Sequence, residues 1–208
     1  YHLVTGVQTC ALPIWQYGQA EPWCVACQDA TSQRFGVNHP HVATSLNNLA
    51  LLYNSMGRYG EAEPLLVRSL VIREQQLGVN HPDVAQSLNN LASLYNSRGR
   101  YSEAEPLYVR SLSIKEQQLG KRHPSVAMSP NALACLCQDQ GRYSEAESHF
   151  LRALSIFFDR LGENHSSTQT GWTNFLYFLR QVIEAGQTDR LSDNSFTQWA
   201  IQQLLQGQ

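Results

Sequence analysis

The sequence predicts an all-α protein, an α-solenoid of tandem helix-turn-helix hairpins, because it repeats itself with a fixed period. Four histidines recur every 42 residues, at His39, His81, His123 and His165. Residues 39–80 and 81–122 are identical at 32 of 42 positions, and residues 81–122 and 123–164 at 22 of 42. A fixed period of about 20 to 50 residues is typical of a repeat array, in which each unit is one supersecondary element.

We expect the first helix of a unit at residues 42–56. Its apolar residues stand at offsets of 0, 3, 4 and 7, which places them on one face of a helix. They are Leu46, Leu49, Ala50 and Tyr53. Pro40 suits the first turn, where its missing N–H is not needed, and Gly57 ends the helix.

The second helix of the unit is expected at residues 59–77, with Gly78 as its stop. In the next two units Ser102 with Glu105, and Ser144 with Glu147, have the S-x-x-E spacing of a capping box, which predicts that the helix starts there. The second helix is apolar over a wide arc. It should therefore contact both its own first helix and the next unit, so a single unit should not fold alone.

The stretch "LNNLALLYNSMGRYGEAEPLLVRSL" resembles a tetratricopeptide repeat. The 42-residue length, with "LNNLA", "EAEPL" and "HPDVA", is similar to the kinesin light chain subtype. This resemblance covers about residues 16–185. It implies a stack of helical hairpins whose first helices line a concave groove that holds peptide ligands.

The 42-residue register divides the chain into units. We expect a partial first repeat with only its second helix at 15–38, full repeats at 39–80, 81–122 and 123–164, and a degenerate repeat with a C-terminal capping helix at 165–208. Pro130 lies inside a first helix, so the repeat at 123–164 should be kinked and less stable. In the final helix, at residues 195–205, the side chains expected to face inward are Trp199, Leu204 and Leu205.

Residues 1–14 lie outside the repeat pattern. "VTGVQTCALPI", at residues 4–14, resembles the translated read-through of a sequencing-library adapter fused at a fragment edge. We therefore treat residues 1–14 as a non-native leader that packs poorly or is disordered. The helix at residues 17–35 would then lack its hairpin partner, which would leave the face with Trp23 and Cys24 uncovered.

Charge and composition exclude several classes of function. Lys and Arg number 15 against 17 Asp and Glu, for a net charge of −2, and no basic face or long apolar run is present. Nucleic-acid binding and membrane association are therefore not expected. A secretion signal is also missing, so we expect a cytoplasmic protein.

Neither the cysteines nor the histidines predict a metal site. Cys24-x-x-Cys27 has a metal or redox spacing, but the repeat register places these residues, like Cys135 and Cys137, at positions of small buried side chains. The four histidines fall one per unit along a ridge, where a capping or packing role is expected. We predict no cofactor, and no catalytic motif indicates an enzyme.

The polar face of the first helices is the candidate binding site. These side chains lie opposite the apolar stripe or beside it. The candidate groove residues are Thr44, Asn47, Asn48, Leu51, Gln86, Asn89, Asn90, Ser93, Asn131 and Asn174. The resemblance implies that Asn48, Asn90 and Asn174 match the groove asparagine that hydrogen-bonds peptide backbone in relatives.

The leading hypothesis is a non-catalytic protein-interaction module that binds a peptide segment of a partner in a concave groove over residues 41–180. The alternative is a sensor or accessory repeat region of a larger bacterial signalling protein, with its catalytic or nucleotide-binding domain upstream. Self-association through the exposed N-terminal edge is a third hypothesis.

Overall fold

The computed structural model describes residues 14–206, with side chains from residue 18 onward, so the predicted leader lies outside the described residues. The described residues form helices joined by short loops and contain no strand. Its helices are α1 (Ile14–Phe35), α2 (Pro40–Ser55), α3 (Tyr59–Leu77), α4 (Pro82–Ser97), α5 (Tyr101–Leu119), α6 (Pro124–Asp139), α7 (Tyr143–Leu161), α8 (Ser166–Glu184) and α9 (Ser195–Gln206), with a short 3-10 turn, η2 (Thr188–Arg190).

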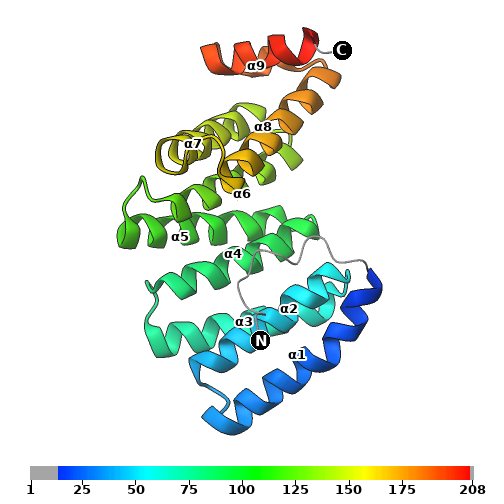
Figure 1. Ribbon diagram of the computed structural model, residues 1–208, viewed down its shortest axis with the longest axis vertical. Helices are drawn as coiled ribbons and strands as arrows, with labels where there is room; N and C mark the ends of the chain where they lie inside the picture. The colour runs from blue at the N-terminus through cyan, green and yellow to red at the C-terminus, as the bar shows by residue number, and fades with distance from the viewer. Residues whose placement is uncertain (1–13, 207–208) are drawn as a thin grey trace. The chain divides into compact units, whose positions relative to one another are not determined.

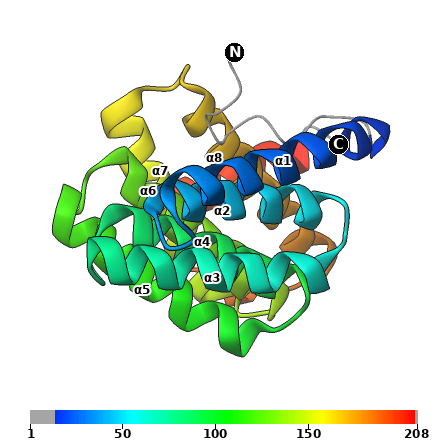
Figure 2. The same cartoon turned by 90° about the horizontal axis from the view of Figure 1, so that it is seen from below.

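The helices form two compact units that divide within α5, after Ile114. Unit 1 contains α1 to α4 and most of α5, and unit 2 contains the end of α5 and α6 to α9. Within each unit, helices that follow one another along the chain lie side by side as hairpins (Figure 1). Seen from below, α1 lies in front of α2, against which it packs (Figure 2). This arrangement confirms the predicted fold class.

The repeated histidines cap the first helices. His39, His81, His123 and His165 occupy the N-cap positions of α2, α4, α6 and α8. Each Nδ1 accepts a hydrogen bond from the backbone N–H two residues later, over 3.1–3.2 Å. A free helix N-terminus leaves four N–H groups without partners, and the imidazole satisfies one of them. The predicted capping role is confirmed.

The second helices begin differently from the prediction. Arg142 is the N-cap of α7 and makes no side-chain capping bond, so Ser144 is already the second helical residue and cannot cap. Its Oγ donates instead to the Arg190 carbonyl, over 2.6 Å. The capping-box interpretation was therefore wrong. In unit 1 the matching Arg58 is held by Glu61, to which it donates two hydrogen bonds.

Neighbouring hairpins in unit 1 share one apolar core. The stripe of α2 is buried, and Leu49, Ala50 and Tyr53 pack in the same cluster as Ala62 and Leu66 of α3. Leu91 and Leu94 of α4 complete this cluster, although they belong to the next hairpin. The second helix of a hairpin therefore contacts both its own first helix and the first helix of the next hairpin, as expected. Apolar burial contributes about 25 cal/mol per Å2, so each hairpin depends on its neighbour for stability.

A buried cation recurs between hairpins, which the sequence analysis did not predict. Arg73 of α3 donates from Nη1 to the Asp83 carbonyl and to Ser87 Oγ, both over 2.9 Å. Burial lowers the pKa of Arg73. One period later Lys115, only 6% exposed, donates from Nζ to Ser129 Oγ over 3.2 Å. Burial lowers the pKa of Lys115 to about 8.

The helix α6 runs without a break through Pro130, which is buried. Proline has no N–H, so the carbonyl of Val126 lacks its intrahelical donor. The kink and the lower stability of this repeat remain predictions.

The last helix faces the core with residues other than those predicted. Thr197, Ala200 and Ile201 are buried, whereas Trp199 is 49% exposed and Leu205 53% exposed. The inward assignment of Trp199 and Leu205 was therefore wrong, although Leu204 does pack against the core. Trp199 stacks on Phe196 at the surface, with ring centroids 6.0 Å apart.

Glu147 explains which face of α9 is buried. This carboxylate is 1% exposed and accepts hydrogen bonds from Thr197 Oγ1, Ser192 Oγ and the Ser192 N–H, over 2.6–2.7 Å. Two and three periods earlier its equivalents pair with arginines: Glu63 binds Arg98 and Arg100, and Glu21 binds Arg58. The residue 42 positions after Arg142 is Glu184, not arginine. The C-terminal segment supplies the missing partners and so closes unit 2.

Candidate peptide-binding faces

The predicted polar face in unit 1 runs along α2 and α4. Side chains about one helical turn apart line each helix and are half-buried or exposed. They are Thr44, Asn48 and Leu51 on α2, and Gln86, Asn90 and Ser93 on α4. Arg73 reaches the edge of this face, where Nη2 lies 3.4 Å from Thr44 Oγ1.

One predicted groove residue is not open to a ligand. Asn47 is only 6% exposed, and its Oδ1 accepts a hydrogen bond of 2.8 Å from Asn90 Nδ2. Asn90 Oδ1 accepts in turn from Gln86 Nε2 over 3.0 Å. Asn47 therefore orients Asn90, and Asn90 keeps one amide hydrogen and one lone pair for a ligand.

Two further asparagines on this face have unused hydrogen-bonding groups. Asn48 is half-buried and forms no side-chain hydrogen bond with any described residue. Asn89 Oδ1 is buried and has no partner within the described chain. Asn89 stands 42 residues after Asn47, and its Oδ1 is likewise covered, so Asn48 is the more accessible of the two.

Unit 2 presents a matching face along α6 and α8. Asn174 Nδ2 lies 3.5 Å from Asn131 Oδ1. The pair of Asn90 and Asn47 has the same arrangement two periods earlier, and the two residues of each pair are 43 positions apart. Tyr177 also lies on this helix and was not predicted; it is 58% exposed and accepts a hydrogen bond of 2.7 Å from Gln181 Nε2. The repeat register could have found it, because Tyr177 stands 84 residues, or two periods, after the predicted groove residue Ser93.

Charged side chains lie at the hairpin turns and pair with one another. Arg100 binds Glu103 and Glu63, and Arg58 binds Glu61 and Glu21. These hydrogen bonds raise the pKa of both arginines. The polar faces of α2 and α4 therefore present mainly neutral amide and hydroxyl groups.

The cysteines follow the predicted register in part. Cys137 is buried, and burial raises the pKa of the half-buried Cys135 thiol to about 11. Cys27 is exposed, so the interpretation of Cys27 as a buried residue was wrong. Its equivalent, Ser69, donates to Ala43 of its own first helix, whereas the described part of the chain contains no such helix for α1.

Within residues 14–206 no group of three or more histidine, cysteine, aspartate or glutamate side chains is placed to hold a metal ion. Among the helices of that range, none is both long and apolar enough to cross a membrane.

The comparison with family models identifies the class. A tetratricopeptide repeat model matches residues 16–75, 42–117 and 83–157, which together span more than half of the chain. The chain therefore belongs to the tetratricopeptide repeat family. Such repeats are generally non-catalytic and typically serve as protein-interaction modules.

Solved structures share this fold. The nearly identical TPR-like repeats of a candidate kinesin light chain from Podosopora anserina are 24% identical, with a TM-score of 0.69, over 91% of this chain and 85% of that one. BtubC (BKLC) from P. vanneervenii is 21% identical, with a TM-score of 0.72, over 93% and 76% of the two chains. No curated protein matches the sequence.

Proposed function

We propose that this protein binds a peptide segment of a partner protein along the amide-bearing faces of its first helices. The observation that carries the proposal is the set of unused amide groups on α2 and α4. Asn48 has no partner among the described residues, and Asn90 keeps one amide hydrogen and one lone pair beyond its bonds to Asn47 and Gln86. An extended peptide offers backbone N–H and C=O groups in alternation, and an asparagine side chain can both donate and accept.

The chemistry of the face favours a segment with few charges. Its amides and hydroxyls suit hydrogen bonds to the peptide backbone. Carboxylates of a ligand would find few free cations, because the arginines at the turns are already paired with glutamates. On unit 2, the exposed Tyr177 adds an aromatic surface beside Asn174 for an apolar side chain. Such a contact is consistent with an affinity near micromolar, about 8 kcal/mol.

The test uses a peptide selected from a random phage library on the full chain. Asn48→Ala with Asn90→Ala should weaken its binding about thirtyfold, since the two lost hydrogen bonds are worth about 1 kcal/mol each and about 1.4 kcal/mol is tenfold. The matched control is Asn38→Ala with Asn80→Ala, which removes two exposed loop amides outside the face. Fluorescence anisotropy gives the affinities. If the two double variants bind equally well, the face is not the binding site.

Self-association is a second candidate because α1 exposes a large aromatic side chain. Trp23 is 79% exposed, while its equivalent in the next repeat, Leu65, packs in the core of unit 1. If α1 mediates dimerisation, Trp23→Ser should yield a monomer by multi-angle light scattering. A dimer that persists in this variant would exclude the α1 face.

A further inference from the structure

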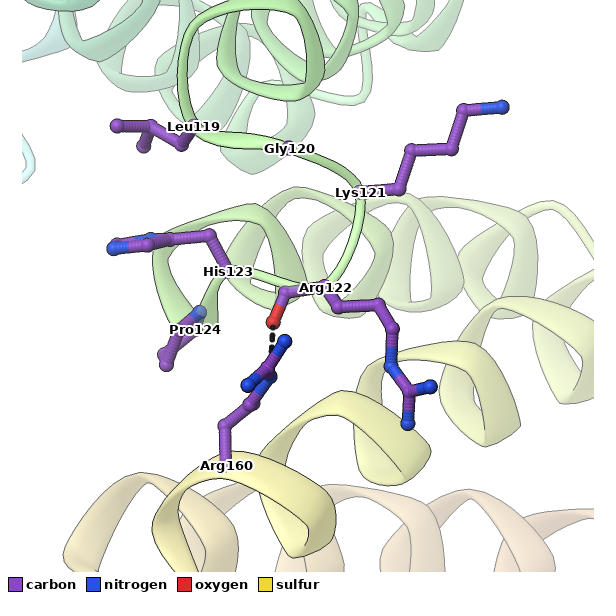
Figure 3. Close-up of a pocket in the computed structure, with 7 residues that line it drawn as sticks. All are labelled: Leu119, Gly120, Lys121, Arg122, His123, Pro124 and Arg160. Carbon is purple, nitrogen blue, oxygen red and sulfur yellow. Dashed lines mark hydrogen bonds between the residues drawn. The ribbon is translucent and has the colours of Figure 1, made fainter.

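An open hollow of about 550 Å3 lies in unit 2 at the junction of α5 and α6 (Figure 3). It is lined by Leu119, Gly120, Lys121, Arg122, His123, Pro124 and Arg160. Figure 3 shows the Lys121 and Arg122 side chains on one side of the loop, with Leu119, His123 and Pro124 on the other. Arg160 reaches up from α7 and donates from Nε to the Arg122 carbonyl, over 3.2 Å.

The cations of this hollow are only partly neutralised. Arg122 pairs with Asp159, but Lys121 forms no ion pair with a described residue. Arg160 uses only Nε within the described chain, which leaves the Nη edge of its guanidinium for a ligand. None of the lining residues is acidic. The hollow is therefore locally positive on a chain whose net charge is −2.

The other repeats show that the fold does not require these cations. The residues equivalent to Lys121 and Arg122 are Val79 and Asn80 in the preceding junction, and Gln118 stands 42 residues before Arg160. The junction nevertheless has the same backbone. Gly78 and Gly120 have φ of 88° and 81°, and the following histidine is the N-cap in both. Three basic residues line this junction at positions where the two preceding junctions have neutral residues, which points to a ligand.

We propose that this hollow is a second binding site, which takes the carboxylates of an acidic segment of a partner protein. The Arg160 guanidinium offers a planar pair of donors that suits a carboxylate, and Lys121 adds a mobile ammonium. The site is distinct in residues and in chemistry from the neutral amide face of the first helices.

The test measures binding of fluorescein-labelled hexaglutamate to the full chain by anisotropy, with hexaglutamine as the neutral probe. Lys121→Val with Arg160→Gln installs the residue types that other repeats carry, so the fold should be retained. We expect hexaglutamate to bind roughly threefold to tenfold more weakly, because exposed ion pairs contribute modestly. Binding of the intact chain should also fall as salt rises.

Two controls separate this site from the peptide-binding face. The variant with Asn48→Ala and Asn90→Ala should bind hexaglutamate as the intact chain does. Transplanting the cations to the first junction, with Val37→Lys, Asn38→Arg and Gln76→Arg, should add a second hexaglutamate site of similar strength. Equal binding by the intact chain and the Lys121→Val, Arg160→Gln variant would overturn the proposal. So would tighter binding of tripolyphosphate than of hexaglutamate, which would exclude a peptide carboxylate as the preferred ligand.

Discussion

Replacing Lys115 by methionine should stabilise the protein at neutral pH. The lysine is buried, and its one described hydrogen-bond acceptor is the hydroxyl of Ser129. Burial lowers the pKa of Lys115 from 10.5 to about 8. Each pKa unit corresponds to about 1.36 kcal/mol, so keeping the lysine charged in the folded protein costs about 3 kcal/mol. Methionine matches the length of the side chain without its charge. Loss of the bond to Ser129 offsets about 1 kcal/mol, which leaves a net gain of about 2 kcal/mol.

The same pKa shift predicts how the gain depends on pH. Between pH 8 and pH 10.5 the folded chain loses the Lys115 proton while the unfolded chain keeps it. The unfolded state then binds more protons, so the stability of the unsubstituted protein rises with pH in this window. The advantage of Lys115→Met should therefore be full below pH 8 and shrink towards pH 10.5.

Urea unfolding followed by circular dichroism at pH 7 and pH 10 measures both quantities, with midpoints compared at constant slope. Lys121→Met is the matched control, because it removes an exposed lysine of the same unit and should leave the midpoint within error. The reasoning is refuted if Lys115→Met is no more stable at pH 7, or if its advantage does not narrow by pH 10.

Three further substitutions test the other structural assignments. Glu147→Ala should cost about 3 kcal/mol and expose the C-terminal helix to proteolysis, because the buried hydroxyl of Thr197 and two part-buried donors of Ser192 lose their acceptor; unchanged protease resistance would contradict this. Pro130→Leu should raise the free energy of unfolding by up to about 3 kcal/mol, since it restores a helix hydrogen bond and a core leucine. A lower free energy of unfolding would show that the core has adapted to proline. His81→Ala should cost about 1 kcal/mol in thermal unfolding, whereas His81→Asn, a good N-cap, should cost almost nothing; equal losses would rule out the capping role.

The sequence predicted the helices because their signals are local. The 42-residue period, the apolar stripe of Leu46, Leu49 and Ala50, and Gly78 as a helix stop depend only on residues within one hairpin. The structure has α3 at the predicted bounds and α2 shifted by two residues at its start and one at its end. The capping box failed because a four-residue spacing does not reveal where the helix starts. In the structure the N-cap position of α7 is occupied by Arg142, which forms an ion pair with Glu145.

The binding face was predicted only in outline. Helical spacing places Asn47, Asn48, Asn89 and Asn90 on neighbouring positions, and it cannot tell which amide a second hairpin will bury. The contact that buries Asn47 comes from Asn90, 43 residues away. Likewise the basic hollow depends on Arg160 approaching a loop 38 residues earlier in the chain.

The sequence by itself determined the all-α class, the repeat length, the positions of the helices and the family, because periodic burial and turn residues act within one hairpin. Only the tertiary structure decided which side chains are covered. Glu147 accepts a hydrogen bond from Thr197, so the face of α9 that bears Thr197 is buried and Trp199 remains at the surface. The physical reason is that burial of a polar group depends on a partner from another hairpin, and no local pattern specifies that partner.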